Sequence, residues 1–277
     1  MQRTILLVLS LLPALAGCGT ISAPSGTPAA SAPAPFVGPG RWVDLTHPLS
    51  SASVFWPTAE PFALEVDFEG RTERGYYYAA NRFCTAEHGG THIDAPRHFA
   101  EGRPTVDAIP LSRLIGPAVV IDVSERVRTS RDHRVDVADL RAWEAQHGPI
   151  PAGAIVLLRT GFARFWPDAE RYLGTTARGE EGAAKLHFPG LHAEAAAWLV
   201  ERGIASVGID TASIDHGPSR DFAAHVALMT HDVPAFENLA SLDALPPTGA
   251  FVVALPTRIE GGSGGPLRIV AWVPEAG

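Results

Sequence analysis

The stretch 88–98 concentrates side chains that bind metal ions and transfer protons. Its three histidines and one aspartate are His88, His92, Asp94 and His98. Imidazole nitrogens and carboxylate oxygens are ligands for zinc, manganese and iron, and histidine also exchanges protons near neutral pH. Their density in so short a stretch indicates a metal-dependent enzyme.

The residues between these side chains predict how the stretch is built. Two glycines follow His88, and they favour a loop leading into a strand rather than a helix. Glycine weakens helices and lets the backbone approach a metal ion closely. In a strand, His92 and Asp94 would point to the same side. Pro96 ends strand pairing and directs His98 back toward them. A lone histidine more often satisfies polar groups in a core, but this cluster favours metal binding or catalysis.

Length and composition limit the classes of protein to consider. The chain has 277 residues, 46% of them hydrophobic, enough for one substantial core or two small ones. Its formal net charge of −8 argues against a nucleic-acid partner, which requires a basic surface.

Residues 1–17 are predicted to be a lipoprotein signal peptide. Arg3 precedes an apolar run over residues 5–15 that is too short to span a membrane. The run ends in Leu-Ala-Gly-Cys, which resembles the bacterial lipobox, so cleavage would leave a lipidated Cys18. The alternative is an ordinary signal peptide followed by a chance cysteine.

Residues 18–40 are predicted to be a flexible linker, because they are rich in Ala, Pro and Ser and almost uncharged. Residues 41–277 form the predicted catalytic domain. We therefore expect an exported protein that faces the periplasm or cell surface, with a lipid anchor as its only membrane contact. The second cysteine, Cys84, then lacks a disulfide partner, and both a buried thiol and a thiol lining the site remain open.

The predicted domain alternates strands with helices. Strands are predicted at 118–123, 154–158, 205–209, 250–255 and 269–273, and helices at 136–147 and 192–202. Helices between buried strands indicate an α/β domain with some parallel pairing. Residues 164–189 are predicted to be a long surface loop, either a lid or substrate wall or an insertion away from the substrate.

Segments spread over the predicted domain, together with 88–98, resemble one known family. The matching segments are 43–49, 56–57, 188–191, 194–199, 208–215, His225 and 236–239. In this order they resemble the metal-dependent cyclase family, which includes bacterial kynurenine formamidase (arylformamidase) and isatin hydrolase. The resemblance runs from about Arg41 to Val273, nearly the whole domain.

The resemblance implies a fold and a set of site residues. The fold is a compact α/β domain of the swivelling β/β/α type with a mixed sheet, assembled as a homo-oligomer, either a dimer or a tetramer. Asp94 or Glu237 can bridge two ions, since a carboxylate has two oxygens. His98 matches the family's acid/base. One or two zinc ions are expected, with manganese as the alternative, and the implied metal ligands are His88, His92, Asp94, His225 and Glu237.

The resemblance further implies hydrolysis of the C–N bond of an aryl amide similar to N-formylkynurenine. A bound divalent ion lowers the pKa of its water from 15.7 toward about 7, and the resulting hydroxide attacks the carbonyl carbon. His98 then takes the proton and delivers it to the leaving nitrogen. Phe55 and Trp56 are candidates for an aromatic wall that holds the substrate, whereas Phe83 is expected in the core.

Two alternatives stay open. One is ring opening of an isatin-like cyclic amide, or of a lactone, by a single manganese ion; the presence of His225 and Glu237 favours the two-metal version instead. The other is a surface lipoprotein that binds a metal or an aromatic ligand without turnover, for which His98 would be dispensable.

Overall fold

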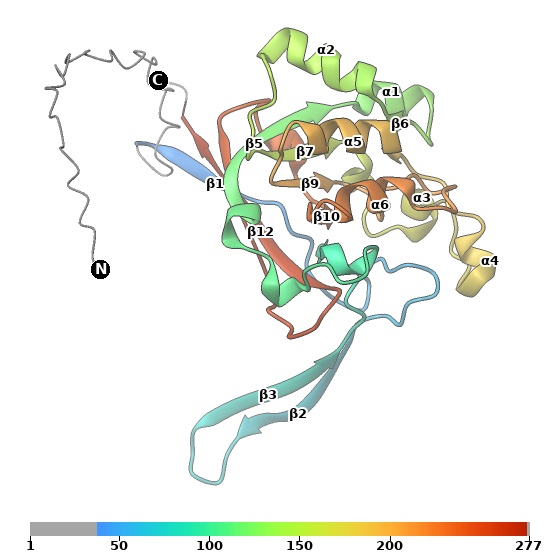
Figure 1. The fold of residues 1–277 in the computed structure, drawn as a ribbon. Coiled ribbons are helices and arrows are strands. Elements are labelled where there is room, and N and C mark those ends of the chain that lie inside the picture. The colour runs from blue at the N-terminus through green and yellow to red at the C-terminus, as the bar shows by residue number, and fades with distance from the viewer. Residues whose placement is uncertain (1–37, 276–277) are drawn as a thin grey trace, which may run out of the picture. The chain divides into compact units, whose positions relative to one another are not determined.

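The structure, a computed structural model, describes residues 38–275 (Figure 1). The predicted signal peptide, Cys18 and nearly all of the predicted linker lie outside the described residues. The strands are β1 (Gly40–Asp44), β2 (Ala63–Arg71), β3 (Tyr77–Cys84), β4 (His92–Asp94), β5 (Ile115–Asp122), β6 (Arg134–Val135), β7 (Ile155–Arg159), β8 (Gly190–Leu191), β9 (Ser206–Ile209), β10 (Ala235–Glu237), β11 (Ala250–Pro256) and β12 (Gly264–Pro274). The α-helices are α1 (Ser124–Thr129), α2 (Val137–His147), α3 (Ala169–Leu173), α4 (Gly179–Ala183), α5 (Ala193–Glu201) and α6 (Ala223–Met229).

A mixed sheet of eight strands organises the domain, in the order β1-β12-β11-β5-β7-β9-β10-β4. The run β5-β7-β9-β10 is parallel and its neighbours are antiparallel. Strand β4 pairs with β10 on one side and with β12 on the other, so the sheet closes on itself. The predicted α/β class with a mixed sheet is confirmed.

The sheet separates two hydrophobic cores, because successive strand residues point to opposite faces. On β5, Val119 and Ile121 belong to the core that also contains side chains of α2, α5 and α6. Ala118 and Val120, which alternate with them, belong to the second core, together with Ile93 of β4 and residues of β1, β11 and β12. Figure 1 shows these helices gathered over one side of the sheet.

The helices predicted from the sequence start and stop where their capping residues require. The Asp136 side chain accepts a hydrogen bond from the backbone N–H of Asp139, and the Asp139 side chain accepts one from the backbone N–H of Asp136, so α2 begins with a capping box. The His192 side chain caps α5 in a similar way. Within residues 38–275, no helix is long and apolar enough to cross a bilayer.

The expectation of a long surface loop at 164–189 is wrong. This segment contains α3 and α4, and the side chains of Tyr172 and Phe188 are completely buried. The Tyr172 hydroxyl donates to the Asn238 side-chain oxygen at 2.9 Å. The segment's glycines suggested a loop, but its aromatic side chains anchor it in the helix-side core.

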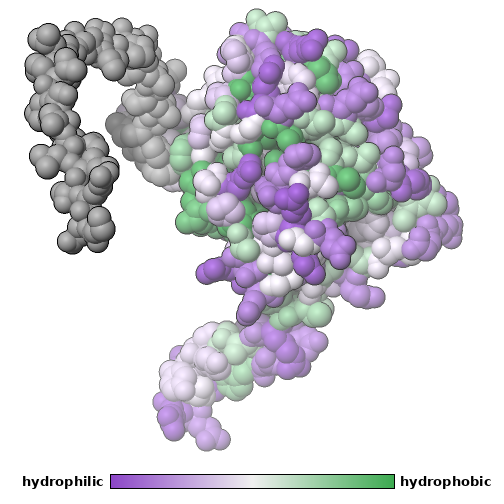
Figure 2. Space-filling view, in the orientation of Figure 1, coloured by the Kyte–Doolittle hydropathy of each residue, from purple (hydrophilic) through white to green (hydrophobic). Residues whose placement is uncertain are grey.

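Strands β2 and β3 form an antiparallel hairpin that projects from the rest of the domain, and we call residues 63–84 the arm (Figure 1). Large apolar side chains on it are exposed, and green and pale atoms mark its surface in Figure 2. Phe83 is 63% exposed, so its expected place in the core is wrong. Cys84 is also exposed, which rules out a buried thiol. Neither hydrophobic core contains a residue of the arm, and β2 and β3 pair only with each other among the described strands.

Candidate metal centre and active site

Strand β4 places two of the expected ligands where the sheet closes. His92 is opposite Glu237 of β10 on one side and Pro266 of β12 on the other. The β12 backbone approaches closely at Gly264, which is opposite Asp94. A β-carbon at Gly264 would overlap the carbonyl oxygen of Ile93 and lie 2.6 Å from the His88 ring, so glycine is required here.

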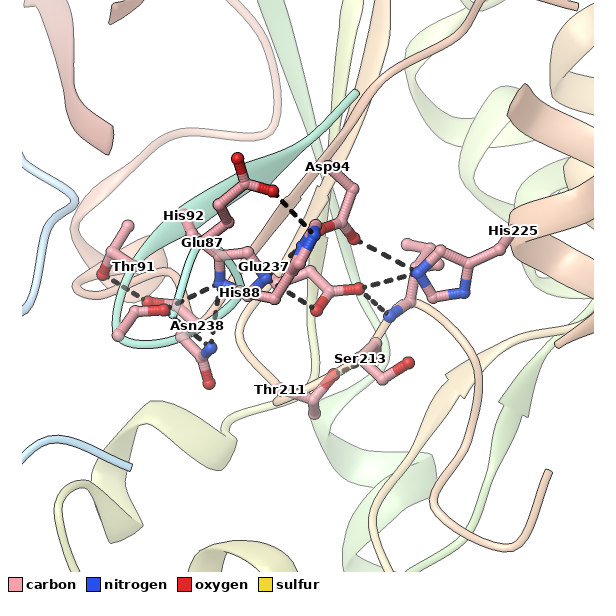
Figure 3. A network of polar contacts seen from close by, with 12 residues as sticks. Glu87, His88, Thr91, His92, Asp94, Thr211, Ser213, His225, Glu237 and Asn238 are labelled. Atoms are coloured by element: carbon pink, nitrogen blue, oxygen red, sulfur yellow. Dashed lines mark hydrogen bonds and ion pairs between the residues drawn. The ribbon is translucent and has the colours of Figure 1, made fainter. Parts of the chain in front are cut away.

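The expected ligand residues form two overlapping groups, within each of which the candidate ligand atoms lie within 4.8 Å of one another. The first group is His88, His92 and Asp94; the second is Asp94, His225 and Glu237. Figure 3 shows the two carboxylates between the imidazole rings. The structure thus brings together residues that lie more than a hundred positions apart in the sequence.

Asp94 belongs to both groups through different oxygens. Its Oδ1 lies 2.6 Å from His88 Nδ1 and 3.2 Å from His92 Nε2, whereas its Oδ2 lies 3.2 Å from His225 Nε2. Glu237 contributes Oε1 at 3.2 Å from His225 Nε2. Metal–nitrogen bonds of about 2.0–2.1 Å in a tetrahedron separate neighbouring ligand atoms by about 3.3 Å. The donor types and most of these separations therefore fit a divalent ion in each group, with Asp94 between them.

Each of the three imidazoles uses its other nitrogen to contact an outer partner. His92 Nδ1 contacts the Gly90 carbonyl oxygen at 2.9 Å, and His225 Nδ1 contacts Asp215 Oδ2 at 2.7 Å. His88 Nε2 contacts the Ser263 hydroxyl at 2.9 Å. Outer partners of this kind fix the ring orientation and tautomer of histidine ligands.

His98 lies beside the first group without taking part in it. After β4, a 3₁₀ turn over Pro96–His98 returns the chain, and the His98 ring stacks on the His88 ring with 3.8 Å between centroids. Within the described residues, the His98 ring has no side-chain hydrogen-bond partner. Burial lowers the pKa of His98 to about 4, so its ring is neutral at pH 7.

A cavity of about 280 Å³ opens over both groups and His98. Its floor is polar, and its walls are mostly apolar: Val54, Phe55, Trp56, Phe99, Ala212 and Phe222. Gly89 leaves room for the Phe55 ring, because a β-carbon at residue 89 would overlap that ring. Phe55 and Trp56, the expected wall residues, both line the cavity.

The comparisons with known proteins identify the family. A family model described as "Putative cyclase" matches residues 43–216. The isatin hydrolase of Roseibium aggregatum is 34% identical over 210 residues, which are 73% of this chain and 78% of that protein. The chain belongs to this cyclase family. The kynurenine formamidase of Bacillus mycoides is 29% identical over 233 residues, 83% of this chain and 96% of that protein.

A solved structure agrees with this assignment. Isatin hydrolase A from Ralstonia solanacearum is 38% identical and has a TM-score of 0.76, over 84% of this chain and 92% of that chain. With hydrolases as its relatives and a metal-binding donor set in its cavity, this cyclase-family chain is a metal-dependent hydrolase. A lipoprotein that binds without turnover is therefore not favoured.

The ligand cluster of this cyclase-family enzyme holds buried charges close together. Burial acts to raise the pKa of Asp94, but the positive charge of His92 and hydrogen bonds from His225 and His88 hold that pKa well below its usual value. Burial and the nearby charge of Asp94 raise the pKa of Glu237. Although burial opposes it, Asp94 raises the pKa of His92 to about 9. The raised pKa of His92 thus offsets the negative charge of Asp94.

Sequence reasoning missed several residues around the site. Asp215 accepts from the backbone N–H groups of Ala224 and His225 and from the His225 ring, so it fixes both the start of α6 and the orientation of a ligand. Phe99 and Phe222 lack any motif, although Phe99 directly follows His98. Ser263 lies 175 residues from His88, and no sequence signal connects the two.

Proposed function

We propose that this cyclase-family enzyme hydrolyses the C–N bond of a small aromatic amide similar to N-formylkynurenine. The observation that carries this proposal is a buried metal-binding donor set beneath a cavity with aromatic walls, with His98 beside it. Zinc is the expected ion, because imidazole and carboxylate ligands at these separations suit it. His88, His92 and Asp94 would hold one ion, and Asp94, His225 and Glu237 a second.

The bound ion supplies Lewis acidity, which lowers the pKa of a water molecule and stabilises negative charge on a carbonyl oxygen. The protein's part is to place the amide and to move protons. His98 is neutral at pH 7 and can accept a proton from the attacking water. An imidazole with a pKa of about 4 is a strong acid once protonated, which suits delivery of that proton to the leaving nitrogen.

The cavity walls support an aromatic substrate. Trp56 and Phe222 have ring centroids 6.2 Å apart, and Phe99 and Phe222 have theirs 5.2 Å apart, so together they form an apolar wall beside the donor cluster. An aryl group packed against these rings would leave its amide next to His98 and the carboxylates. Aryl amines also leave more readily than alkyl amines, which favours anilide-type substrates.

A second candidate is ring opening of an isatin-like cyclic amide, or of a lactone, with a single manganese ion. The similarity to isatin hydrolases and the small cavity of about 280 Å³ favour it, since a fused bicyclic ring is compact. The second donor group, completed by His225 and Glu237, favours the two-metal amidase instead.

Metal analysis together with a substrate screen tests the proposal and separates the two candidates. The full chain, purified without added metal, is analysed for metal content and assayed with formyl-anilides, isatin and lactones. Two zinc ions per chain with formyl-anilide hydrolysis are expected. One manganese ion with isatin hydrolysis would establish the second candidate, and no hydrolysis of any of the three classes would contradict both.

Replacement of His98 tests its role separately from metal binding. His98→Ala should lower kcat by about 10²–10⁴-fold and leave the metal content unchanged, because general acid–base catalysis contributes on this scale. His231→Ala, at an exposed histidine just after α6, is the matched control and should keep full activity. Unchanged turnover in His98→Ala would remove His98 from the mechanism.

We further propose that the enzyme is a homodimer joined through the arm. Isolated two-stranded hairpins are at best marginally stable in water, and Leu64, Val66 and Phe83 are each more than half exposed on the arm. Exposed aromatic side chains bury roughly 150–250 Å² each when covered, so two arms supply much of the about 1,600 Å² of a stable interface. Sedimentation equilibrium should give twice the chain mass; the mass of one chain would contradict the proposal.

Export and lipid anchoring remain proposals that rest on residues 1–18. Cell fractionation should place the enzyme in the membrane fraction, and Cys18→Ser should release it or block its processing. Enzyme found with residues 1–17 still attached would contradict the proposal.

A further inference from the structure

One hydrogen-bonded chain beside the metal ligands has no part in the chemistry above. His88 Nε2 lies 2.9 Å from Ser263 Oγ, and Ser263 Oγ lies 2.6 Å from Glu87 Oε2. Figure 3 shows Glu87 next to the His88 ring, on the side away from Asp94. Imidazole, hydroxyl and carboxylate thus form a line that leads away from the donor cluster.

The direction of these hydrogen bonds follows from counting protons. An ionised carboxylate only accepts hydrogen bonds, so the single hydroxyl proton of Ser263 must be donated to Glu87. The Ser263 oxygen can then only accept from His88, which requires a proton on His88 Nε2. His88 Nδ1 lies 2.6 Å from Asp94 Oδ1 within the donor cluster. An ion bound at Nδ1 would replace the hydrogen bond between these two atoms and leave the single proton of the neutral ring on Nε2.

Ser263 is held rigidly relative to the ligand strand. Its carbonyl oxygen accepts from the backbone N–H of Ala95 at 2.8 Å, directly after β4. Its own backbone N–H donates to Glu87 Oε2 at 3.1 Å. Both the hydroxyl and the carboxylate are therefore fixed in the frame that positions Asp94.

The other two histidine ligands do not need such a device. His92 contacts a backbone carbonyl oxygen and His225 contacts a carboxylate, and both groups can only accept. The outer partner of His88 is a hydroxyl, which donates as readily as it accepts. Without Glu87, Ser263 could donate to His88 Nε2 and favour the ring form with its proton on the metal side.

We propose that Glu87 and Ser263 are positioning residues, which act through the tautomer of His88 to direct its Nδ1 lone pair at the first metal position. This proposal rests on the proposed function for the identity of the metal site, but its test reads ion binding and needs no substrate. The relevant quantity is the affinity of the full-length protein for Zn²⁺, measured by competition with a chromophoric chelator.

Ser263→Ala removes the acceptor for His88 Nε2. The affinity for Zn²⁺ should fall by about 10–100-fold, the range typical for loss of an outer partner of a metal ligand. Ser263→Thr keeps the hydroxyl and should restore most of the affinity. Ser130→Ala, at an exposed serine just after α1, is the matched control and should bind Zn²⁺ as the unchanged protein does. Equal losses in the Ala and Thr variants would overturn the proposal, because shape would then matter and not the hydroxyl.

Glu87→Ala tests the direction of the hydrogen bonds. It should weaken Zn²⁺ binding, whereas Glu87→Gln should weaken it less, because the amide oxygen can still accept from Ser263. The double variant of Glu87→Ala and Ser263→Ala should lose no more affinity than Ser263→Ala alone, since Glu87 acts only through Ser263. Additive losses would overturn the proposal.

The outcomes also separate this proposal from the proposed function. Weaker Zn²⁺ binding in Ser263→Ala without hydrolysis by any variant would support the positioning role and contradict the amidase. Full Zn²⁺ affinity in Ser263→Ala and Glu87→Ala, with wild-type hydrolysis of formyl-anilides, would overturn the positioning role and leave the amidase standing. The thermal midpoint of the metal-free variants should match that of the unchanged protein, which distinguishes loss of a ligand orientation from loss of the fold.

Discussion

The arm and the donor cluster are neighbours in the sequence and opposites in burial. The arm, residues 63–84, exposes Leu64, Val66 and Phe83, with Phe83 63% exposed. The cluster begins four residues later at His88, and His92 and Asp94 are at most 2% exposed. The apolar side chains are thus outside and the ionisable ones inside, the reverse of the usual arrangement.

The proposals above give the two regions different binding partners. Buried charges are expensive unless paired or bound to a metal, so the cluster calls for cations. Exposed apolar patches often mark surfaces for interaction, and the proposed partner of the arm is a second copy of this chain. The following predictions test whether the two regions depend on these different additions.

Asp94→Asn should have the largest effect, because one side chain serves both donor groups. The affinity for metal and the value of kcat/KM should each fall by about 10³-fold or more, since metal ions supply several kcal/mol of transition-state stabilisation. Elemental analysis and steady-state kinetics measure the two. Asp243→Asn, at an exposed aspartate, is the control. A variant that keeps its metal and its activity would refute the shared role of Asp94.

Charges on the arm should separate the subunits without emptying the metal site. Leu64 and Phe83 are opposite each other in the hairpin, and replacing both with Glu should weaken the dimer by about 100-fold, as loss of an interface hot spot does. Sedimentation velocity over a range of concentrations measures this. Leu255→Glu, at a side chain 47% exposed on β11, should leave the dimer intact. Dissociation in both variants would show that the arm is not the specific interface.

The pH dependence of metal binding should reveal the protons that compete with the ion for its ligands. Because Asp94 raises the pKa of His92 to about 9 against the effect of burial, this ring is protonated at pH 7 and must lose a proton to bind an ion. Burial also opposes a charge on His225, but hydrogen bonds to Asp215 and Asp94 raise its pKa well above the usual value. Zn²⁺ affinity should therefore rise about tenfold per pH unit for each proton displaced between pH 7 and 9. Chelator competition at several pH values measures it, and a flat profile would count against these raised pKa values.

The same shift has a consequence for stability without metal. The folded pKa of His92, about 9, lies above its unfolded value of 6.5, so its stabilisation is complete below pH 6.5 and is lost as the pH rises through 9. The thermal midpoint of metal-free protein should fall over that interval, and bound Zn²⁺ should reverse the loss.

Arg82→Ala should have the smallest effect, although Arg82 contacts both Glu65 and Asp67. Its side chain is 68% exposed, and exposed ion pairs contribute about 0–1 kcal/mol. The free energy of unfolding should change by less than about 0.5 kcal/mol in urea denaturation. A larger change would show that the second chain of the dimer buries the ion pairs of the arm. The donor cluster, by contrast, is buried within one chain.

The sequence predicts the parts of this molecule that depend on local patterns. The spacing of His88, His92, Asp94 and His98 places them together. The glycines permit the turn before the strand, and the proline ends the strand. The helices at 136–147 and 192–202 follow from their caps and their apolar faces.

The parts that it does not predict depend on distant contacts or on the absence of contacts. Ser263 reaches His88 only because β12 pairs with β4, which no local pattern encodes. Alternating apolar and charged residues in the arm are typical of a half-buried strand, yet Phe83 is 63% exposed. The aromatic residues of 164–189 fill the core from a segment whose glycines are typical of loops.

The closure of the sheet at β4 also determines when the ion can enter. Strand β4 receives its neighbours from residues 235–237 and 264–266, so a growing polypeptide lacks this pocket until translation is almost finished. An unfolded chain rarely contains a preformed ion site. The ion therefore binds in the compartment where the chain finishes folding, and the metals present there compete for the site. Under the proposed export, folding would end outside the cytosol, and the metal supply of that compartment would select the ion.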